Sequence, residues 1–203
     1  MTVQTADETL TIPLDGLTEA EVQVGFGGGE LIIGVADPGV LVSGTFEGGV
    51  SQTTSGPGKI ALEPTASGRV LLTKGPVRWQ MGLTAEIPVD LRLDSGANRT
   101  TIDLRALRLR HLELHTGASE TIVQMPASGQ SSAHVVCGFA SVVLEVPEGV
   151  AARVRGKVSM GSTTADQVRF PPTSGGWASP DFETARDRVD ISVEGGFGSV
   201  KVV

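Results

Sequence analysis

Residues 91–104 read LRLDSGANRTTIDL, and residues 112–125 read LELHTGASETIVQM, which is the same pattern 21 residues later. A third copy, AHVVCGFASVVLEV, follows at 133–146, and a fourth begins at Val154. Apolar residues lie under apolar residues and glycine lies under glycine, while the positions between them are polar. A repeat of this kind, without insertions, is typical of coils stacked in a solenoid.

Each copy predicts two strands, because apolar and polar residues alternate both before and after a central glycine. We expect these glycines, Gly96, Gly117 and Gly138, to lie at a corner, where glycine permits positive φ and close backbone approach. Equivalent strands of successive coils would run parallel at about 4.8 Å, with right-handed crossovers. We therefore predict one all-β domain over residues 1–203, a single-stranded right-handed parallel β-solenoid with regular coils over about 88–160.

Segments outside the regular coils also alternate and predict further strands. A Gly-Phe pair recurs at Phe26, Phe139 and Phe197, which predicts corners of the same kind in different coils. The strands expected outside the regular coils are 10–14, 22–24, 31–33, 40–42, 59–62, 70–73, 79–83 and 189–193.

The insertion at 171–187, PPTSGGWASPDFETARD, interrupts the repeat with a polar segment that carries two aromatic residues. Long loops of this kind often bind a partner, so Trp177 and Phe182 are candidates for an interaction loop. The alternative is that the two aromatics fold back and cover a face or a coil end.

The last strand contains Val200, Lys201 and Val202 and would end the stack with an apolar edge that carries one charge. Uncovered strand edges template association. We therefore expect a homodimer through the terminal coils, unless the insertion or the N-terminal residues cap the end.

Composition limits the classes of partner. The chain has 16 Lys and Arg against 23 Asp and Glu, a net charge of −7, which argues against binding nucleic acid or an anionic membrane. A single cysteine, Cys137, excludes an intramolecular disulfide and a multi-cysteine metal site. Residues 1–15 lack the basic and apolar regions of a signal peptide, and no apolar run approaches the roughly 20 residues of a membrane span. We expect a cytoplasmic protein without membrane insertion.

Two sets of polar side chains, one along a strand and one in a column across coils, are candidates for a metal site or a catalytic site. His111, Glu113 and His115 alternate with inward leucines, but the two histidines lie about 13 Å apart along the strand. We interpret them as an exposed polar face and expect no bound metal. Asp103 and Glu145 lie two coils apart in one outward column, at about 9.6 Å. This separation is close to that of inverting glycosidases, although a solvated acidic column is the simpler interpretation.

Two further motifs carry little chemistry. The glycine-rich run at 25–30 lacks the third glycine of a dinucleotide fingerprint and leads into a strand. Cys137 has inward parity, and no histidine is placed by sequence to activate it as a nucleophile. We therefore expect no cofactor and no catalytic centre.

Several of these segments resemble the bacterial toast-rack family. The segments are WQM at 79–81, IPVDL at 87–91, SGA at 95–97, IDL at 102–104, LELHTGA at 112–118 and GGFGSVKV at 195–202. The resemblance covers roughly residues 10–203, and the family's β-solenoid domain is similar to the C-terminal region of LiaF-type cell-wall-antibiotic-response proteins and to related adhesin-like proteins. It implies a β-solenoid that acts as a non-catalytic scaffold or protein-interaction module, with a link to envelope-stress signalling. A polysaccharide-active enzyme and a self-assembling structural protein or adhesin stay open as alternatives.

Overall fold

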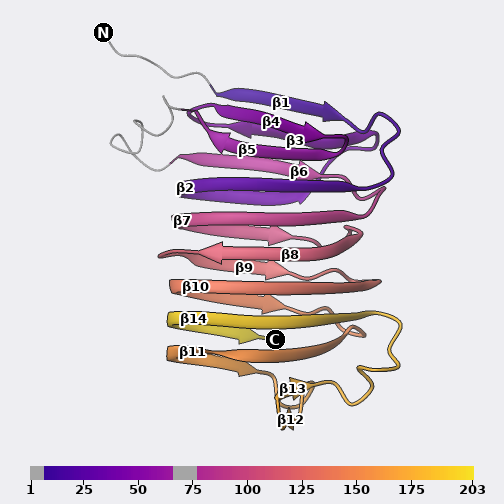
Figure 1. The fold of residues 1–203 in the computed structure, drawn as a ribbon, viewed down its shortest axis with the longest axis vertical. Helices are drawn as coiled ribbons and strands as arrows, with labels where there is room; N and C mark the ends of the chain where they lie inside the picture. The colour runs from indigo at the N-terminus through magenta and orange to yellow at the C-terminus, as the bar shows by residue number, and fades with distance from the viewer. Residues whose placement is uncertain (1–6, 66–76) are drawn as a thin grey trace.

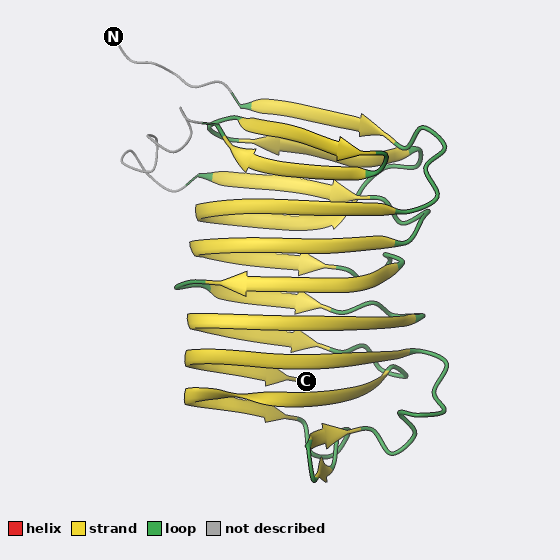
Figure 2. Cartoon of the chain, in the orientation of Figure 1, coloured by secondary structure: helices red, strands yellow, loops and turns green. Residues whose placement is uncertain are grey.

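The coils of the computed structural model are built largely from long strands that bend near their middle. Three of them, β2 (Ala20–Val35), β7 (Val89–Asp103) and β10 (Gln130–Glu145), each form two limbs of one flattened coil (Figure 1). The structure describes residues 7–65 and 77–203, and its strands form one sheet that winds around the core (Figure 2). The prediction of an all-β fold is confirmed. This part of the chain has no helix with the length and hydrophobicity of a membrane span.

Apolar side chains that alternate along each limb form the core between the two limbs. In β7, for example, Leu91, Leu93 and Ile102 are fully buried, while Arg92 and Asp94 on the opposite face are partly exposed. Each such side chain contributes about 1.5–3 kcal/mol through burial. The coils cannot bury these faces singly, so their stability depends on stacking.

The regular coils have the register that the repeat predicts. β7 pairs in parallel with β8 (Leu109–Thr116) and β9 (Glu120–Gln124), and both pair in parallel with β10. Leu112 lies between Leu91 and Ala133, so the offset of 21 residues is the stacking offset. The right-handed path of the coils stays a prediction.

The C-terminal coils are stacked in a different order from the sequence. β14 (Arg188–Val202) lies between β10 and β11 (Ala151–Ala165) and pairs in parallel with both. Ile191 therefore separates Ala133 from Val154, and the prediction that the fourth copy stacks on the third is wrong. The long segment between β11 and β14 allows the chain to return and bury β14 on both sides.

This order also removes the predicted terminal edge. Val200 and Val202 are fully buried, and Lys201 lies between Val143 of β10 and Thr164 of β11. The prediction that these residues form an end-to-end edge is wrong, because the last strand of the sequence is an interior strand of the stack.

The N-terminal coils also depart from a simple succession. β5 (Lys59–Pro64) pairs with the first limb of β2 and β6 (Arg78–Leu83) with its second limb, both in parallel. Three further pairs are antiparallel. β6 pairs with β3 (Val40–Phe46), and β3 pairs on its other side with β1 (Glu8–Pro13). β5 pairs with β4 (Val50–Gly56). The strands between β2 and β7 therefore lie on one side of β2, and β7 pairs with its other side. The strand predicted at 70–73 lies outside the described residues.

The insertion covers part of the C-terminal end. Its short strands β12 (Pro172–Thr173) and β13 (Gly176–Ala178) form an antiparallel pair, and β13 continues the sheet onto β11. Phe182 is buried, with the Arg153 guanidinium 4.4 Å from its ring centroid, and Trp177 packs against the core. The insertion is a cap over one part of β11, so Phe182 is not available to a partner.

Candidate functional site

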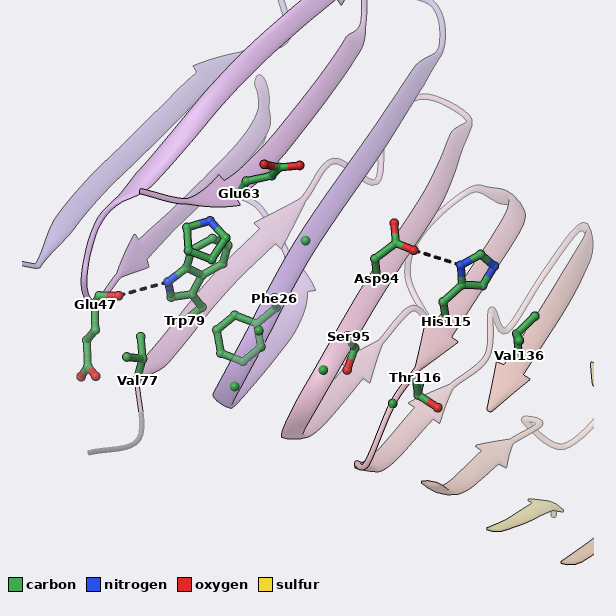
Figure 3. A pocket seen from close by; sticks show the side chains of 16 residues that line it. Phe26, Glu47, Glu63, Val77, Trp79, Asp94, Ser95, His115, Thr116 and Val136 are labelled. Carbon is green, nitrogen blue, oxygen red and sulfur yellow. Dashed lines mark hydrogen bonds and ion pairs between the residues drawn. The ribbon is translucent and has the colours of Figure 1, made fainter. Parts of the chain in front are cut away.

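A hollow of about 550 Å³ opens at the corners of β2, β7 and β8, where β5 ends and β6 begins (Figure 3). We call it the corner groove. It combines corner glycines, two aromatic residues and a polar wall. The residues on which the argument depends are Gly25, Phe26, Glu63, Trp79, Asp94, Gly96, His115, Thr116 and Gly117.

The corner glycines allow backbones of successive coils to touch. A Cβ atom at Gly96 would lie 2.2 Å from the Gly27 oxygen, and one at Gly117 would lie 3.0 Å from the Gly96 oxygen. Gly138 repeats the arrangement, with its Cβ position 3.0 Å from the Gly117 oxygen. None of the three predicted corner glycines has positive φ. Close approach of neighbouring backbones therefore explains why these positions hold glycine. The prediction that they have positive φ is wrong.

Aromatic side chains form the floor of the corner groove. The rings of Phe26 and Trp79 have centroids 5.3 Å apart, and Phe46 packs edge-on against Trp79 at 4.9 Å. The indole nitrogen of Trp79 donates a hydrogen bond of 3.2 Å to the carbonyl oxygen of Glu47. Because the indole N–H has its partner, the floor is apolar and fixed.

A cluster of charges forms the wall contributed by β7 and β8. His115 Nδ1 lies 2.9 Å from Asp94 Oδ1, and its Nε2 lies 3.1 Å from Glu113 Oε1. Arg92 pairs with both carboxylates, at 2.9 Å to Asp94 and 2.8 Å to Glu113. Burial alone would raise the pKa of Asp94. The hydrogen bonds from Arg92 and the charges of Arg92 and His115 together outweigh burial, so the pKa lies below its ordinary value.

The lowered pKa of Asp94 predicts a pH-dependent stability. A carboxyl whose pKa is lower in the folded state stabilises the fold above its unfolded pKa of about 4, and this contribution is lost as pH falls through the folded pKa. We expect the native chain to lose more stability than Asp94→Asn between about pH 5 and 2. Urea midpoints at both pH values measure this. Equal losses would show that the ion pairs of Asp94 do not stabilise the fold.

Two polar side-chain groups at the corner groove have no partner within residues 7–65 and 77–203. The exposed carboxylate of Glu63 makes no ion pair or hydrogen bond there. The hydroxyl of Thr116 is buried and has no hydrogen-bond partner. The Thr116 oxygen has almost no accessible surface, so of the two groups only the Glu63 carboxylate is open to a ligand in the hollow.

The predicted polar face does not form a metal site. His111 Nδ1 lies 2.8 Å from Ser132 Oγ, while His115 contacts Asp94 and Glu113. The structure thus separates the two histidines. The described part of the chain contains no group of three or more His, Cys, Asp or Glu side chains arranged to hold a metal ion.

The acidic column of Asp103 and Glu145 is present, but both carboxylates already have hydrogen-bond partners. Gln124 lies between Asp103 and Glu145 in register and donates a 3.0 Å hydrogen bond to Glu145. Asp103 pairs with Arg105 at 2.7 Å, and this hydrogen bond lowers the pKa of Asp103. A general acid of a glycosidase needs a raised pKa, so this column does not support the enzyme alternative.

Cys137 is buried, as its inward parity predicted, and burial raises the pKa of its thiol, which makes it a poor nucleophile. Other side chains differ from what the sequence predicted. Phe26 is buried in the groove floor, whereas Phe139 and Phe197 are exposed, so the Gly-Phe pairs are not equivalent. Asp94 was not among the predicted site residues. Its two-residue spacing from Arg92 on an outward face is the signal that could have identified it.

Comparisons with known proteins agree with this fold. Residues 1–145 match the family model described as the N-terminal domain of toast_rack, DUF2154. The chain is similar to a crystal structure from Clostridium sporogenes ATCC 15579, described as a "putative cell adhesion protein", with a TM-score of 0.82 and 17% identity over 97% of this chain and 98% of that one. At this identity the match shows the fold alone.

A second crystal structure, described as a "putative adhesin" from Bacteroides fragilis NCTC 9343, has a TM-score of 0.40 and 10% identity over 99% of this chain and 100% of that one. This similarity is too low to support an argument. No protein with curated annotation matches the chain.

Proposed function

Because the toast-rack model matches residues 1–145, the chain belongs to the toast-rack family, and from this premise we propose that it is a non-catalytic module that binds a segment of a partner protein in the corner groove. The observation that carries the proposal is the largely apolar hollow beside the unpaired carboxylate of Glu63. Binding sites usually combine an apolar lining with a few such polar groups.

The lining defines the chemistry of the partner segment. Phe26 and Trp79 favour an apolar side chain, and the exposed carboxylate of Glu63 favours a neighbouring Lys or Arg. The partly exposed carboxylate of Asp94 adds a second negative charge at the groove wall. We therefore propose that the partner segment carries an aliphatic or aromatic residue next to a basic residue.

A selection from a random peptide library tests this chemistry. We expect the peptides that the native chain selects to share an apolar residue next to Lys or Arg, and we expect Gly25→Val to bind them at least about tenfold more weakly, a loss of about 1.4 kcal/mol. A Cβ at Gly25 would lie 3.4 Å from Glu63 Cγ, so valine narrows the groove without striking backbone.

The matched control is Gly34→Val on the same strand. A Cβ at Gly34 has no atom within 4 Å, so this variant makes the same change outside the groove and should bind the peptides normally. Titration of one selected peptide against the three proteins gives the affinities. Equal binding by Gly25→Val and the native chain would show that the peptides bind elsewhere.

We further propose that the partner acts in envelope-stress signalling and that the module works in the cytoplasm. The resemblance to LiaF-type proteins supports the first statement, and the free Cys137 fits a compartment without disulfides. Gly25→Val tests the signalling role in the source bacterium through its response to cell-wall antibiotics. An unchanged response would contradict this role and would leave the peptide-binding result unaffected.

Adhesion is the second candidate. The structure with a TM-score of 0.82 is described as a cell adhesion protein, which supports this alternative only by analogy of fold.

A further inference from the structure

Three large apolar side chains are exposed in one column at the corners of the last three coils. Phe139 of β10 lies opposite Phe197 of β14, and Met160 of β11 lies opposite Phe197 on its other side. The two phenylalanine rings stack with centroids 4.7 Å apart and planes 7° apart. Phe139 is 69% exposed, Met160 65% and Phe197 40%. Exposed apolar side chains gathered in one place indicate an interaction surface.

The column ends at β11, whose outer edge is only partly covered. β14 pairs with β11 on one side along its whole length, but β13 pairs on the other side only with Arg153–Arg155. No strand in the described part of the chain pairs with the outer side of residues 158–165. Figure 1 shows β12 and β13 below the middle of the coil, whereas the bend of β11, on the left, has nothing beneath it. The backbone groups along this edge can pair with a further strand.

The edge of β11 lacks the residues that discourage pairing. Residues 158–165 read VSMGSTTA and contain no charge and no proline. β1, the strand at the other end of the stack, reads ETLTIP and contains both Glu8 and Pro13. Charges and prolines protect natural edge strands, and β11 lacks both along this edge. β4 (VSQTTSG) also pairs on one side only and lacks both, but it has no exposed large apolar side chain, whereas β11 has Met160.

We propose that this edge pairs with the same edge of a second copy of the chain, antiparallel, about a two-fold axis through Ser162. Ser162 lies opposite Ser199 near the middle of the free edge. A two-fold axis makes one edge its own complement. The net charge of −7 opposes contact between two copies, and residues 158–165 of this edge add no charge to that opposition.

The proposed dimer predicts a large effect of charge at Ser162. Two copies of Ser162→Lys would place two ammonium groups directly opposite each other, which destabilises strand pairing. We expect light scattering at tens of micromolar to give about twice 21.0 kDa for the native chain and 21.0 kDa for Ser162→Lys. Ser141→Lys is the matched control, because Ser141 lies in the same column two coils away, and it should remain a dimer.

A cysteine at the same position tests the register. Directly opposed residues of an antiparallel pair have Cα atoms about 4.5–5.5 Å apart, within the disulfide range of about 4.4–6.8 Å. We expect oxidation to link Ser162→Cys into a covalent dimer and to leave Ser141→Cys unlinked, since the native Cys137 is buried. A monomeric native chain, a dimer that survives Ser162→Lys, or open-ended oligomers would overturn the proposal.

Discussion

Leu114→Asp should leave no folded protein. Leu114 is fully buried in β8, between Leu93 of β7 and Val135 of β10, which are also fully buried. A carboxylate there has no partner and no water, and the column that holds three coils together would be interrupted. We expect a loss of more than about 4 kcal/mol, which is comparable to the whole stability of many domains. Circular dichroism and denaturant titration measure the loss.

The neighbouring residue provides the control for this prediction. Glu113 points outward and pairs with Arg92 and His115 on the partly exposed wall of the corner groove. Exposed ion pairs contribute little, so Glu113→Ala should cost at most about 1 kcal/mol. If Glu113→Ala were the more destabilising of the two, the assignment of inward and outward faces would be reversed.

Gly96→Ala should be nearly as damaging, although it adds a single methyl group. The new Cβ would lie 2.2 Å from the carbonyl oxygen of Gly27, and this contact is with backbone that belongs to the neighbouring coil. Two coils would have to separate at the corner, so we expect a loss of about 4 kcal/mol or more. The urea midpoint of Gly96→Ala against the native chain measures it.

Two other glycines make the result interpretable. Gly117→Ala brings its Cβ to 3.0 Å from the Gly96 oxygen and should have an intermediate cost, whereas Gly34→Ala meets no atom within 4 Å. A glycine replaced without strain usually gains about 0.4–1 kcal/mol through the unfolded state. A similar midpoint for all three variants would show that close backbone approach does not explain the corner glycines.

The repeat predicted the regular coils because local alternation and a constant offset determine which residues stack. Leu91, Leu112 and Ala133 lie in one column, as the pattern requires. The pattern does not determine the order of the coils once long segments intervene. The short segments 104–108 and 125–129 connect successive regular coils directly, whereas the segment after β11 is long enough for β14 to return and enter between β10 and β11.

The candidate site was harder to predict than the fold. The corner groove depends on β2 and β7, which lie far apart in the sequence but pair with each other, and on β5 and β6, which pair with the other side of β2. Its wall follows the repeat, since Asp94 lies beside His115 and Gly96 is equivalent to Gly117, but the repeat indicates a corner and not a hollow. The open edge depends on the stacking order, so the predicted edge at Val202 was assigned to the wrong strand.

Amide hydrogen exchange with a selected peptide tests the central claim, that the corner groove is the binding site. We expect the peptide to slow exchange in residues 94–97 and 115–118, which form its wall, and to leave residues 171–187 of the cap unchanged. The Gly25→Val variant should show no such protection at the same peptide concentration. Protection confined to the cap, or equal protection in Gly25→Val, would contradict the account.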